Sequence, residues 1–362
     1  MTAYDSAGPD AKRTDSARRT VLVTGGAGYI GSHTAKALYA AGYLPVVFDS
    51  LRSGHRAAVR WGPLIEGDIR DTQALTDCMG RYAPVAVIHF AALIEVGESM
   101  AKPTEYWDVN LNGTASLINA MVQSSVDNIV MSSTAAVYGT PQCQQAISEA
   151  AAMAPINTYG DTKLAAERYI ANHCRAHGMT GTALRYFNAA GASSDGDIGE
   201  AHPNETHLIP LAIEAALGFA PPLSLFGSDF PTPDGTCVRD FVHVEDLARA
   251  HVMAIERPIN RGSFDALNLG TGTGTSVLEI IKAVSQHLER DVPYKASDRR
   301  SGDPSVLVAD PTRAKEMLGW SASQSSINQI VDSAARWRKN PQFGFNATTA
   351  LNDQPIVCQN NI

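Results

Sequence analysis

The sequence lacks the features that mark several large classes of protein. It contains no run of about 18 apolar residues, and its first 20 residues lack the apolar core of a signal peptide. Its five cysteines form no C-x-x-C pair, and its ten histidines form no H-E-x-x-H pattern. We therefore expect a cytoplasmic protein with reduced thiols, no membrane partner and no metal site.

The charge balance excludes another class of partner. Lys and Arg total 29 against 37 Asp and Glu, which gives a formal net charge of -8. A chain this acidic is a poor candidate for nonspecific binding of nucleic acid, although local arginines and helix N-termini can still receive an anionic ligand. The length of 362 residues and the 44% hydrophobic content allow a large core and two lobes.

Short apolar runs alternate with amphipathic segments along most of the chain. The amphipathic segments lie near Ile30–Ala41, Pro103–Ser124 and Thr158–Ala176. The apolar runs are continuous, as expected for parallel strands that helices cover on both faces. The pattern predicts an α/β fold with a doubly wound parallel (Rossmann) sheet. The predicted strands are Thr20–Thr24, Leu44–Phe48, Pro84–Phe90, Asn128–Ser133, Ala183–Phe187 and Ala266–Leu269.

Composition changes divide the chain into domains. Residues 191–239 are rich in Gly, Pro, Asp and Ser, which is typical of a different lobe. We expect a smaller C-terminal α/β lobe that binds substrate. The predicted division is a tail at 1–18, a dinucleotide-binding domain at 19–190 to which 240–275 returns, a substrate lobe at 191–239 and 276–340, and a tail at 341–362.

The first predicted strand leads into a glycine-rich turn, after which a helix is predicted. Glycines there allow a tight turn and a close approach of the backbone to a pyrophosphate, which the helix N-terminus would also attract. A glycine pattern alone also fits an ordinary loop, but the flanking strand and helix favour a dinucleotide site. The residues concerned are Gly25, Gly28, Tyr29, Ile30 and Gly31.

Acidic residues at the ends of later strands fit the rest of a dinucleotide. Asp49 lies about 20 residues beyond the last glycine, where a carboxylate accepts from ribose hydroxyls and repels a 2′-phosphate. This favours NAD over NADP, with Arg52 as a nearby complication and a turn or capping role as the alternative. Asp68 and Ile69 could meet the adenine, although Asp68 also fits a helix cap. The segment Phe90, Ala91 and Ala92 closes a predicted strand, and its two small alanine side chains leave room for the nicotinamide.

A second constellation predicts catalysis on an alcohol. Tyr159 and Lys163 lie four residues apart on a predicted helix and therefore share one face. An adjacent ammonium, together with a positive nicotinamide ring, lowers the pKa of a phenol and makes it a general base. Thr134, at the end of a predicted strand, could hold the substrate oxygen beside Tyr159. Strand-end capping is the alternative for Thr134 and an adequate account of Ser132.

From about residue 21 to 337 the sequence resembles the extended short-chain dehydrogenase/reductase superfamily, and within it the UDP-glucose (UDP-galactose) 4-epimerases. The motifs that carry this resemblance are Gly25–His33, Glu66–Arg70, His89–Ser99, Arg185–Asn188 and Phe226–Asp246. The resemblance implies epimerisation at C4 of a UDP-hexose through a transient 4-keto sugar, with tightly bound NAD. It also implies a homodimer that serves galactose metabolism or supplies UDP-galactose for polysaccharide.

The resemblance further assigns contacts residue by residue. It implies cofactor contacts by Ser132, Tyr159, Lys163 and Phe187. The chemistry of the implied UDP contacts agrees, because arginines can grip a diphosphate, an aromatic ring can cover uracil and an aspartate can accept from ribose. Those UDP-sugar contacts are Thr134, Asn188, His207, Leu208, Phe226, Arg239, Arg300, Asp303 and Leu307.

Departures from the family pattern leave the preferred sugar open. Ile94 stands where a Lys can occur, His207 replaces an Asn, and Leu307 occupies a position that varies with tolerance for an N-acetyl group. A UDP-pentose 4-epimerase would use the same residues and stays open as an alternative. A sugar-nucleotide dehydratase is disfavoured, because Ala135 and Ala136 stand where its acid and base would be. A non-catalytic NAD-sensing regulator usually lacks the Tyr and Lys.

Overall fold

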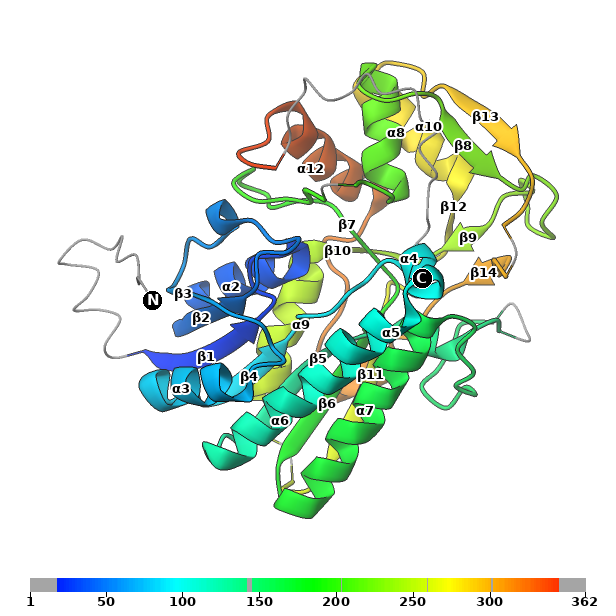
Figure 1. Ribbon diagram of the computed structural model, residues 1–362. Helices are drawn as coiled ribbons and strands as arrows, with labels where there is room; N and C mark the ends of the chain where they lie inside the picture. The colour runs from blue at the N-terminus through cyan, green and yellow to red at the C-terminus, as the bar shows by residue number, and fades with distance from the viewer. Residues whose placement is uncertain (1–17, 142–144, 203, 259, 301, 345–362) are drawn as a thin grey trace.

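The computed structural model describes residues 18–141, 145–202, 204–258, 260–300 and 302–344. A seven-stranded sheet forms its centre, in the order β11-β6-β5-β4-β1-β2-β3 (Figure 1). Every pairing in it is parallel, which confirms the predicted Rossmann sheet. The strands are β1 (Arg19–Thr24), β2 (Tyr43–Asp49), β3 (Leu64–Glu66), β4 (Ala86–His89), β5 (Asn128–Thr134), β6 (Thr180–Tyr186) and β11 (Phe264–Leu269).

Helices cover both faces of this sheet because its strands are apolar on both sides. In β1, Val21 and Val23 pack toward one face with Leu247, while Leu22 packs toward the other with Leu117. The first face carries α2 (Tyr29–Ala40), α9 (Val244–Glu256) and α11 (Thr312–Leu318). The second carries α3 (Thr72–Tyr82), α6 (Gly113–Gln123) and α7 (Thr158–His177).

A smaller lobe with its own core lies above the sheet in Figure 1. Three helices pack together there, α8 (Leu208–Leu217), α10 (Val277–Leu288) and α12 (Ile327–Lys339), beside the parallel pair β8 (Leu223–Phe226) and β13 (Tyr294–Ser297). Short strands join the lobes, namely β7 (Asn188–Ala190) with β10 (Phe241–His243), and β9 (Val238–Arg239) with β12 (Thr275–Ser276) and β14 (Val306–Leu307).

Two sequence expectations need correction. The range 276–340 does not lie wholly in the smaller lobe, since α11 packs against β11 and α9 and buries Ala314 and Trp320 in the sheet domain's core. The predicted helix Pro103–Ser124 is divided, because a π-helical segment, η2 (Trp107–Asn112), separates α5 (Pro103–Tyr106) from α6. Three short elements complete the chain: α4 (Val96–Ala101), η1 (Arg56–Ala58) and η3 (Ala135–Tyr138).

The remaining expectations concern the ends, the thiols and membranes. The predicted tails fall almost entirely outside the described residues, as do Cys143 and Cys358. The other three cysteines, Cys78, Cys174 and Cys237, are buried and not disulfide-bonded. Among the helices of the described residues, none combines the length and apolar character needed to cross a membrane.

Candidate active site

The glycine-rich turn between β1 and α2 can adopt its shape only with glycine at two positions. Gly25 has a φ of 72°, and a Cβ there would lie 2.5 Å from the backbone nitrogen of Ala91. A Cβ on Gly31 would lie 2.3 Å from the carbonyl oxygen of Gly25. Gly28 caps α2 without a side-chain hydrogen bond, and the first turn of α2 carries no acidic residue. The turn therefore presents a helix N-terminus that suits an anionic group.

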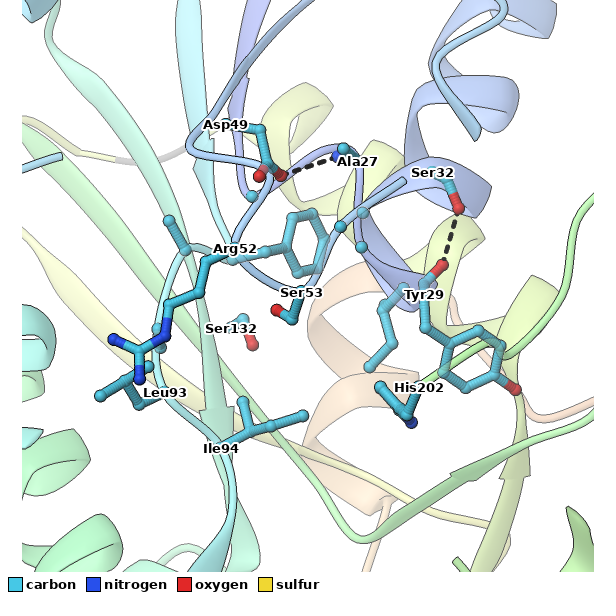
Figure 2. A pocket seen from close by; sticks show the side chains of 18 of the residues that line it. Ala27, Tyr29, Ser32, Asp49, Arg52, Ser53, Leu93, Ile94, Ser132 and His202 are labelled. Carbon is cyan, nitrogen blue, oxygen red and sulfur yellow. Dashed lines mark hydrogen bonds between the residues drawn. The ribbon is translucent and has the colours of Figure 1, made fainter. Parts of the chain in front are cut away.

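A cavity of about 260 Å³ opens at this turn and runs along the carboxyl ends of the central strands. Figure 2 shows Asp49, Ser132, Ile94 and His202 around it. Most of the residues predicted from the sequence to bind cofactor or substrate line this one cavity. They are Gly25, Gly28, Tyr29, Ile30, Gly31, Asp49, Asp68, Ile69, Phe90, Ala91, Ala92, Ser132, Thr134, Tyr159, Phe187, Asn188 and His207.

Asp49 is fixed by the loops around it. Its Oδ2 accepts from the backbone N–H of Ala27 at 2.9 Å, and its Oδ1 accepts from that of Leu51 at 2.8 Å (Figure 2). Burial nevertheless raises the pKa of Asp49. Arg52, the cation that could have received a 2′-phosphate, instead pairs with Glu105 at 2.5 Å. The carboxylate thus faces the cavity without a neighbouring counter-charge from Arg52, an arrangement that suits ribose hydroxyls better than a phosphate.

Asp68 is held mainly by an arginine side chain. Its carboxylate pairs with Arg70 at 2.6 Å, and hydrogen bonds from Arg70 lower its pKa. Arg70 also pairs with Asp108, from the π-helical segment η2. Asp68 therefore reaches the cavity wall beside Ile69, but an adenine amine would share the carboxylate with Arg70.

The predicted catalytic side chains lie together at the other end of the cavity. Tyr159 and Lys163 are both buried on α7, and Thr134 lines the same part of the cavity as Tyr159. Thr134 caps η3, since its hydroxyl accepts from the N–H of Ala136 at 3.1 Å. The capping interpretation of Thr134 is therefore confirmed, and its role toward the substrate oxygen stays a prediction.

Burial dominates the electrostatics of this pair. It raises the pKa of Tyr159 to about 12, and the nearby Thr134 hydroxyl opposes this only in part. Burial also lowers the pKa of Lys163 to about 8, against the attraction of Glu167. The expected lowering of the phenol's pKa combines Lys163 with a positive nicotinamide ring, so it stays a prediction for the protein with bound cofactor.

Hydrogen bonds that the sequence analysis missed hold the start of α7. The Oγ of Ser99 accepts from the N–H of Tyr159 at 3.2 Å, and Asn157 caps the helix through the N–H of Gly160 at 2.8 Å. The buried Asn110 donates to the hydroxyl of Thr162 at 3.0 Å and accepts from the N–H of Leu93 at 2.8 Å. Asn110 lies in η2, so the π-helical segment joins the cavity wall to the catalytic helix.

A buried ion pair supports the same helix from within. Glu167 receives two hydrogen bonds from Arg185 of β6, at 2.9 and 2.6 Å, and one from Ser133. Arg185 also donates to the hydroxyl of Tyr138 at 2.9 Å. Since Glu167 lies one turn beyond Lys163, its carboxylate attracts the ammonium. The i, i+4 spacing of Lys163 and Glu167 is the signal that could have revealed it.

The remaining predicted nucleotide contacts gather in the smaller lobe, outside the lining of the main cavity. Arg239 is buried and pairs with Asp303 at 3.6 Å, and its Nε and Nη2 atoms have no hydrogen-bond partner among the described residues. The guanidinium of Arg300 lies 4.0 Å from the centre of the Phe226 ring and covers one face of that ring. A buried guanidinium with unused donors suits a diphosphate.

Leu208 and Leu307 take different places from the polar contacts. Leu208 begins α8 and lines a small hollow together with Asn188 and His207. Leu307 is fully buried in β14 and packs in a cluster with Phe187 and Ala135. Neither side chain lines the main cavity, so their roles toward a sugar stay predictions.

The chain is similar to known proteins over most of its length. The NAD dependent epimerase/dehydratase family matches residues 21–270. A UDP-glucose 4-epimerase of Rhizobium leguminosarum bv. trifolii is 49% identical over 321 residues, which cover 89% of this chain and 98% of the relative.

Solved structures agree with these matches. The UDP-glucose 4-epimerase of Brucella ovis in complex with NAD is 49% identical, with a TM-score of 0.85, over 90% of this chain and 98% of that one. The UDP-glucose 4-epimerase of Bifidobacterium longum in complex with NAD+ and UDP is 37% identical, with a TM-score of 0.84, over 90% of this chain and 100% of that one.

Proposed function

Because the chain belongs to the NAD dependent epimerase/dehydratase family, we propose that Tyr159, Lys163 and Thr134 invert C4 of a UDP-hexose. The protein is an NAD-dependent 4-epimerase that interconverts UDP-glucose and UDP-galactose. The observation that carries our assignment of residues is that Tyr159 and Thr134 both line the cavity that begins at the glycine turn.

The residues around the cavity fit NAD. The glycine turn and the uncapped start of α2 suit its pyrophosphate, and Asp49 suits its adenosine ribose. When bound, NAD would supply the hydride acceptor and donor that inversion at C4 requires. Since the net redox change is zero, the cofactor stays with the protein throughout.

In the proposed mechanism the protein removes one proton from the substrate and later returns it. Tyr159 takes the proton of the C4 hydroxyl at its phenolic oxygen, while Thr134 holds the same sugar oxygen through its hydroxyl. The 4-keto sugar stays attached to UDP, turns about its link to the diphosphate and presents its other face. Tyr159 then returns the proton. Lys163 would supply positive charge that favours the phenolate form of Tyr159.

The smaller lobe is proposed to retain the intermediate through its nucleotide. Arg239 and Arg300 would bind the diphosphate oxygens, Phe226 would cover the uracil, and Asp303 would accept from the ribose. The unused donors of the buried Arg239 support this assignment. Asn188 has a buried Oδ1 atom without a hydrogen-bond partner in the described part of the chain, and it lines the main cavity near the sugar.

A direct assay tests the function against its alternatives. With UDP-galactose as substrate, we expect UDP-glucose to appear without added cofactor or net NADH. Its amount is measured in stopped, deproteinised samples to which UDP-glucose dehydrogenase and NAD are added afterwards. A UDP-pentose 4-epimerase would instead turn over UDP-xylose faster than UDP-galactose. A dehydratase would release a 4-keto-6-deoxy sugar, and an NAD-sensing regulator would leave all these substrates unchanged.

Cofactor identity provides a second prediction. Acid extraction of the purified protein should release NAD rather than NADP, because the buried Asp49 carboxylate repels a 2′-phosphate. Asp49→Asn replaces one acceptor oxygen by a donor and should weaken NAD binding roughly tenfold or more, since hydrogen bonds to charged groups contribute about 1.5–3 kcal/mol.

Titration of NAD and NADP onto cofactor-free protein, followed by intrinsic fluorescence, measures this change. Asp77→Asn is the matched control, because Asp77 is an exposed acid on α3 outside the lining of the cavity. Recovery of mainly NADP from wild type, or equal losses in the two variants, would remove Asp49 from the selection of the cofactor.

The protein is further proposed to act as a cytoplasmic homodimer in galactose metabolism. Partly exposed apolar side chains, including Trp107 and Val122 on the consecutive segments η2 and α6, support an interface on that side. Light scattering with size-exclusion chromatography measures the mass in solution, and a monomer at micromolar concentration contradicts the dimer.

A further inference from the structure

The loop that precedes α8 places two imidazoles and two carboxylates around one point. The residues are Glu200, His202, Glu205 and His207, here called the Glu-His cluster, and one potential ligand atom of each lies within 4.8 Å of all the others. Three of them, Glu200, His202 and His207, also line the main cavity. The ring of His202 lies 6.4 Å from that of Tyr29, at the glycine turn (Figure 2). The mechanism proposed above uses none of the four as an acid, base or ligand.

The four nitrogen–oxygen distances in the cluster fit the edges of a coordination tetrahedron. The Nδ1 atom of His207 lies 2.6 Å from Glu200 Oε1 and 3.2 Å from Glu205 Oε1. The Nδ1 atom of His202 lies 3.2 and 3.8 Å from the same two oxygens. Ligands about 2.0–2.1 Å from a tetrahedral zinc ion are about 3.3 Å apart, so these four edges bracket the expected value.

The orientation of Glu200 favours a common centre over a simple ion pair with His207, whereas His207 Nδ1 does form a hydrogen bond with Glu205 Oε1. Glu200 Oε1 is buried and, among the described residues, accepts no hydrogen bond of ordinary geometry, although His207 Nδ1 is only 2.6 Å away. The side chain of Glu200 is 5% exposed. A buried oxygen this close to a ring nitrogen, yet not aligned with it, is expected where both atoms point at a third.

A supporting shell holds one carboxylate in place. Arg338 of α12 donates to Glu205 Oε2. Oε1 of the same carboxylate accepts from the backbone N–H groups of Thr206 at 2.9 Å and His207 at 3.0 Å and also faces the cluster. Arg338 also pairs with Glu214 of α8 at 3.0 Å. Such outer contacts orient metal ligands, and two carboxylates with two neutral imidazoles balance the charge of a divalent cation. No metal was expected from the sequence because the histidines form no H-E-x-x-H pattern, and that criterion does not detect the spacing Glu-x-His-x-x-Glu-x-His.

We propose that the Glu-His cluster is a binding site for one divalent transition-metal ion of the zinc class, coordinated tetrahedrally by two imidazole nitrogens and two carboxylate oxygens. The ion would join the loop before α8 to α12 through Arg338 and fix the cavity wall beside Tyr29. This proposal does not depend on the epimerase function, because metal uptake is measured without turnover.

The test is titration of chelator-dialysed full-length protein with Co²⁺ alone and with Zn²⁺ alone. We expect one ion per chain by elemental analysis and an intense visible absorption band of tetrahedral Co²⁺. Glu200→Gln keeps the shape of the side chain but not its charge, and His202→Asn removes a ring on the more accessible side of the cluster. Each should weaken binding of both ions by about 100-fold or more.

His287→Asn is the matched control, because His287 and Asp332 form an exposed histidine–carboxylate pair 3.8 Å apart elsewhere on the surface. X-ray absorption of the zinc-loaded wild type, which needs no variant, should count two imidazole ligands. The proposal is overturned if wild type takes up no more metal than after denaturation. It is equally overturned if Glu200→Gln binds as tightly as the control, or if the bound zinc has no imidazole ligand.

Discussion

Tyr159→Phe is expected to reduce the rate of epimerisation by about 10³-fold or more. The substitution removes only the phenolic oxygen, the atom proposed to take the proton of the C4 hydroxyl, and general-base groups contribute about 10²–10⁴-fold. UDP binding should persist, since the nucleotide contacts lie in the smaller lobe and none of them involves Tyr159. Steady-state kinetics with UDP-galactose and calorimetric titration with UDP measure the two quantities separately.

A second buried tyrosine offers the control for this experiment. Tyr106 packs in the same cluster as Tyr159, but its hydroxyl donates to the carbonyl oxygen of Glu95 at 2.8 Å rather than facing the substrate. Tyr106→Phe removes the same atom and should keep the rate within about tenfold, as expected for the loss of one structural hydrogen bond. Equal losses in the two variants, or a Tyr159→Phe rate near that of wild type, would show that Tyr159 is not the base.

The sheet domain could be predicted from sequence because its signals are local. The apolar run before Gly25 and the helix pattern after it fixed both the first strand and the cofactor turn, and Tyr159 and Lys163 share a face by spacing alone. The helix α11 could not be placed in this way, because only tertiary packing of Ala314 and Trp320 attaches it to the sheet domain. The π-helical segment was also missed, since its residues follow a helical pattern on both sides.

The site was predictable in its members but not in its energetics. Spacing brings Tyr159 to Lys163, yet the sign of the pKa shift depends on burial, which no short motif encodes. The Arg185–Glu167 pair joins a strand to a helix and becomes visible only in three dimensions. Buried ion pairs of this kind contribute to geometry more reliably than to stability. Composition alone does not distinguish Arg239 and Arg300 from arginines at the surface. Only the fold of the smaller lobe shows where they lie.

Lys163→Met is expected to reduce turnover strongly at neutral pH and to move the acid limb of the pH–rate profile to higher pH. Methionine is close to lysine in shape but carries no charge, so the buried site remains filled. The pKa of Tyr159 is already raised to about 12 by burial, and formation of its phenolate therefore requires nearby positive charge. Without the ammonium only the nicotinamide ring supplies it, and a smaller fraction of phenolate exists at each pH.

The alkaline side of the same profile gives an independent check. The pKa of Lys163 is lowered to about 8, so wild type has the ammonium below about pH 8 and loses it as the pH rises through that value. An inflection in kcat/KM near pH 8 should therefore appear in wild type and be absent from Lys163→Met. Lys315→Met, an exposed lysine on α11, is the control and should keep both limbs. If Lys163→Met keeps the wild-type acid limb, Lys163 orients the cofactor without supplying the charge that stabilises the phenolate.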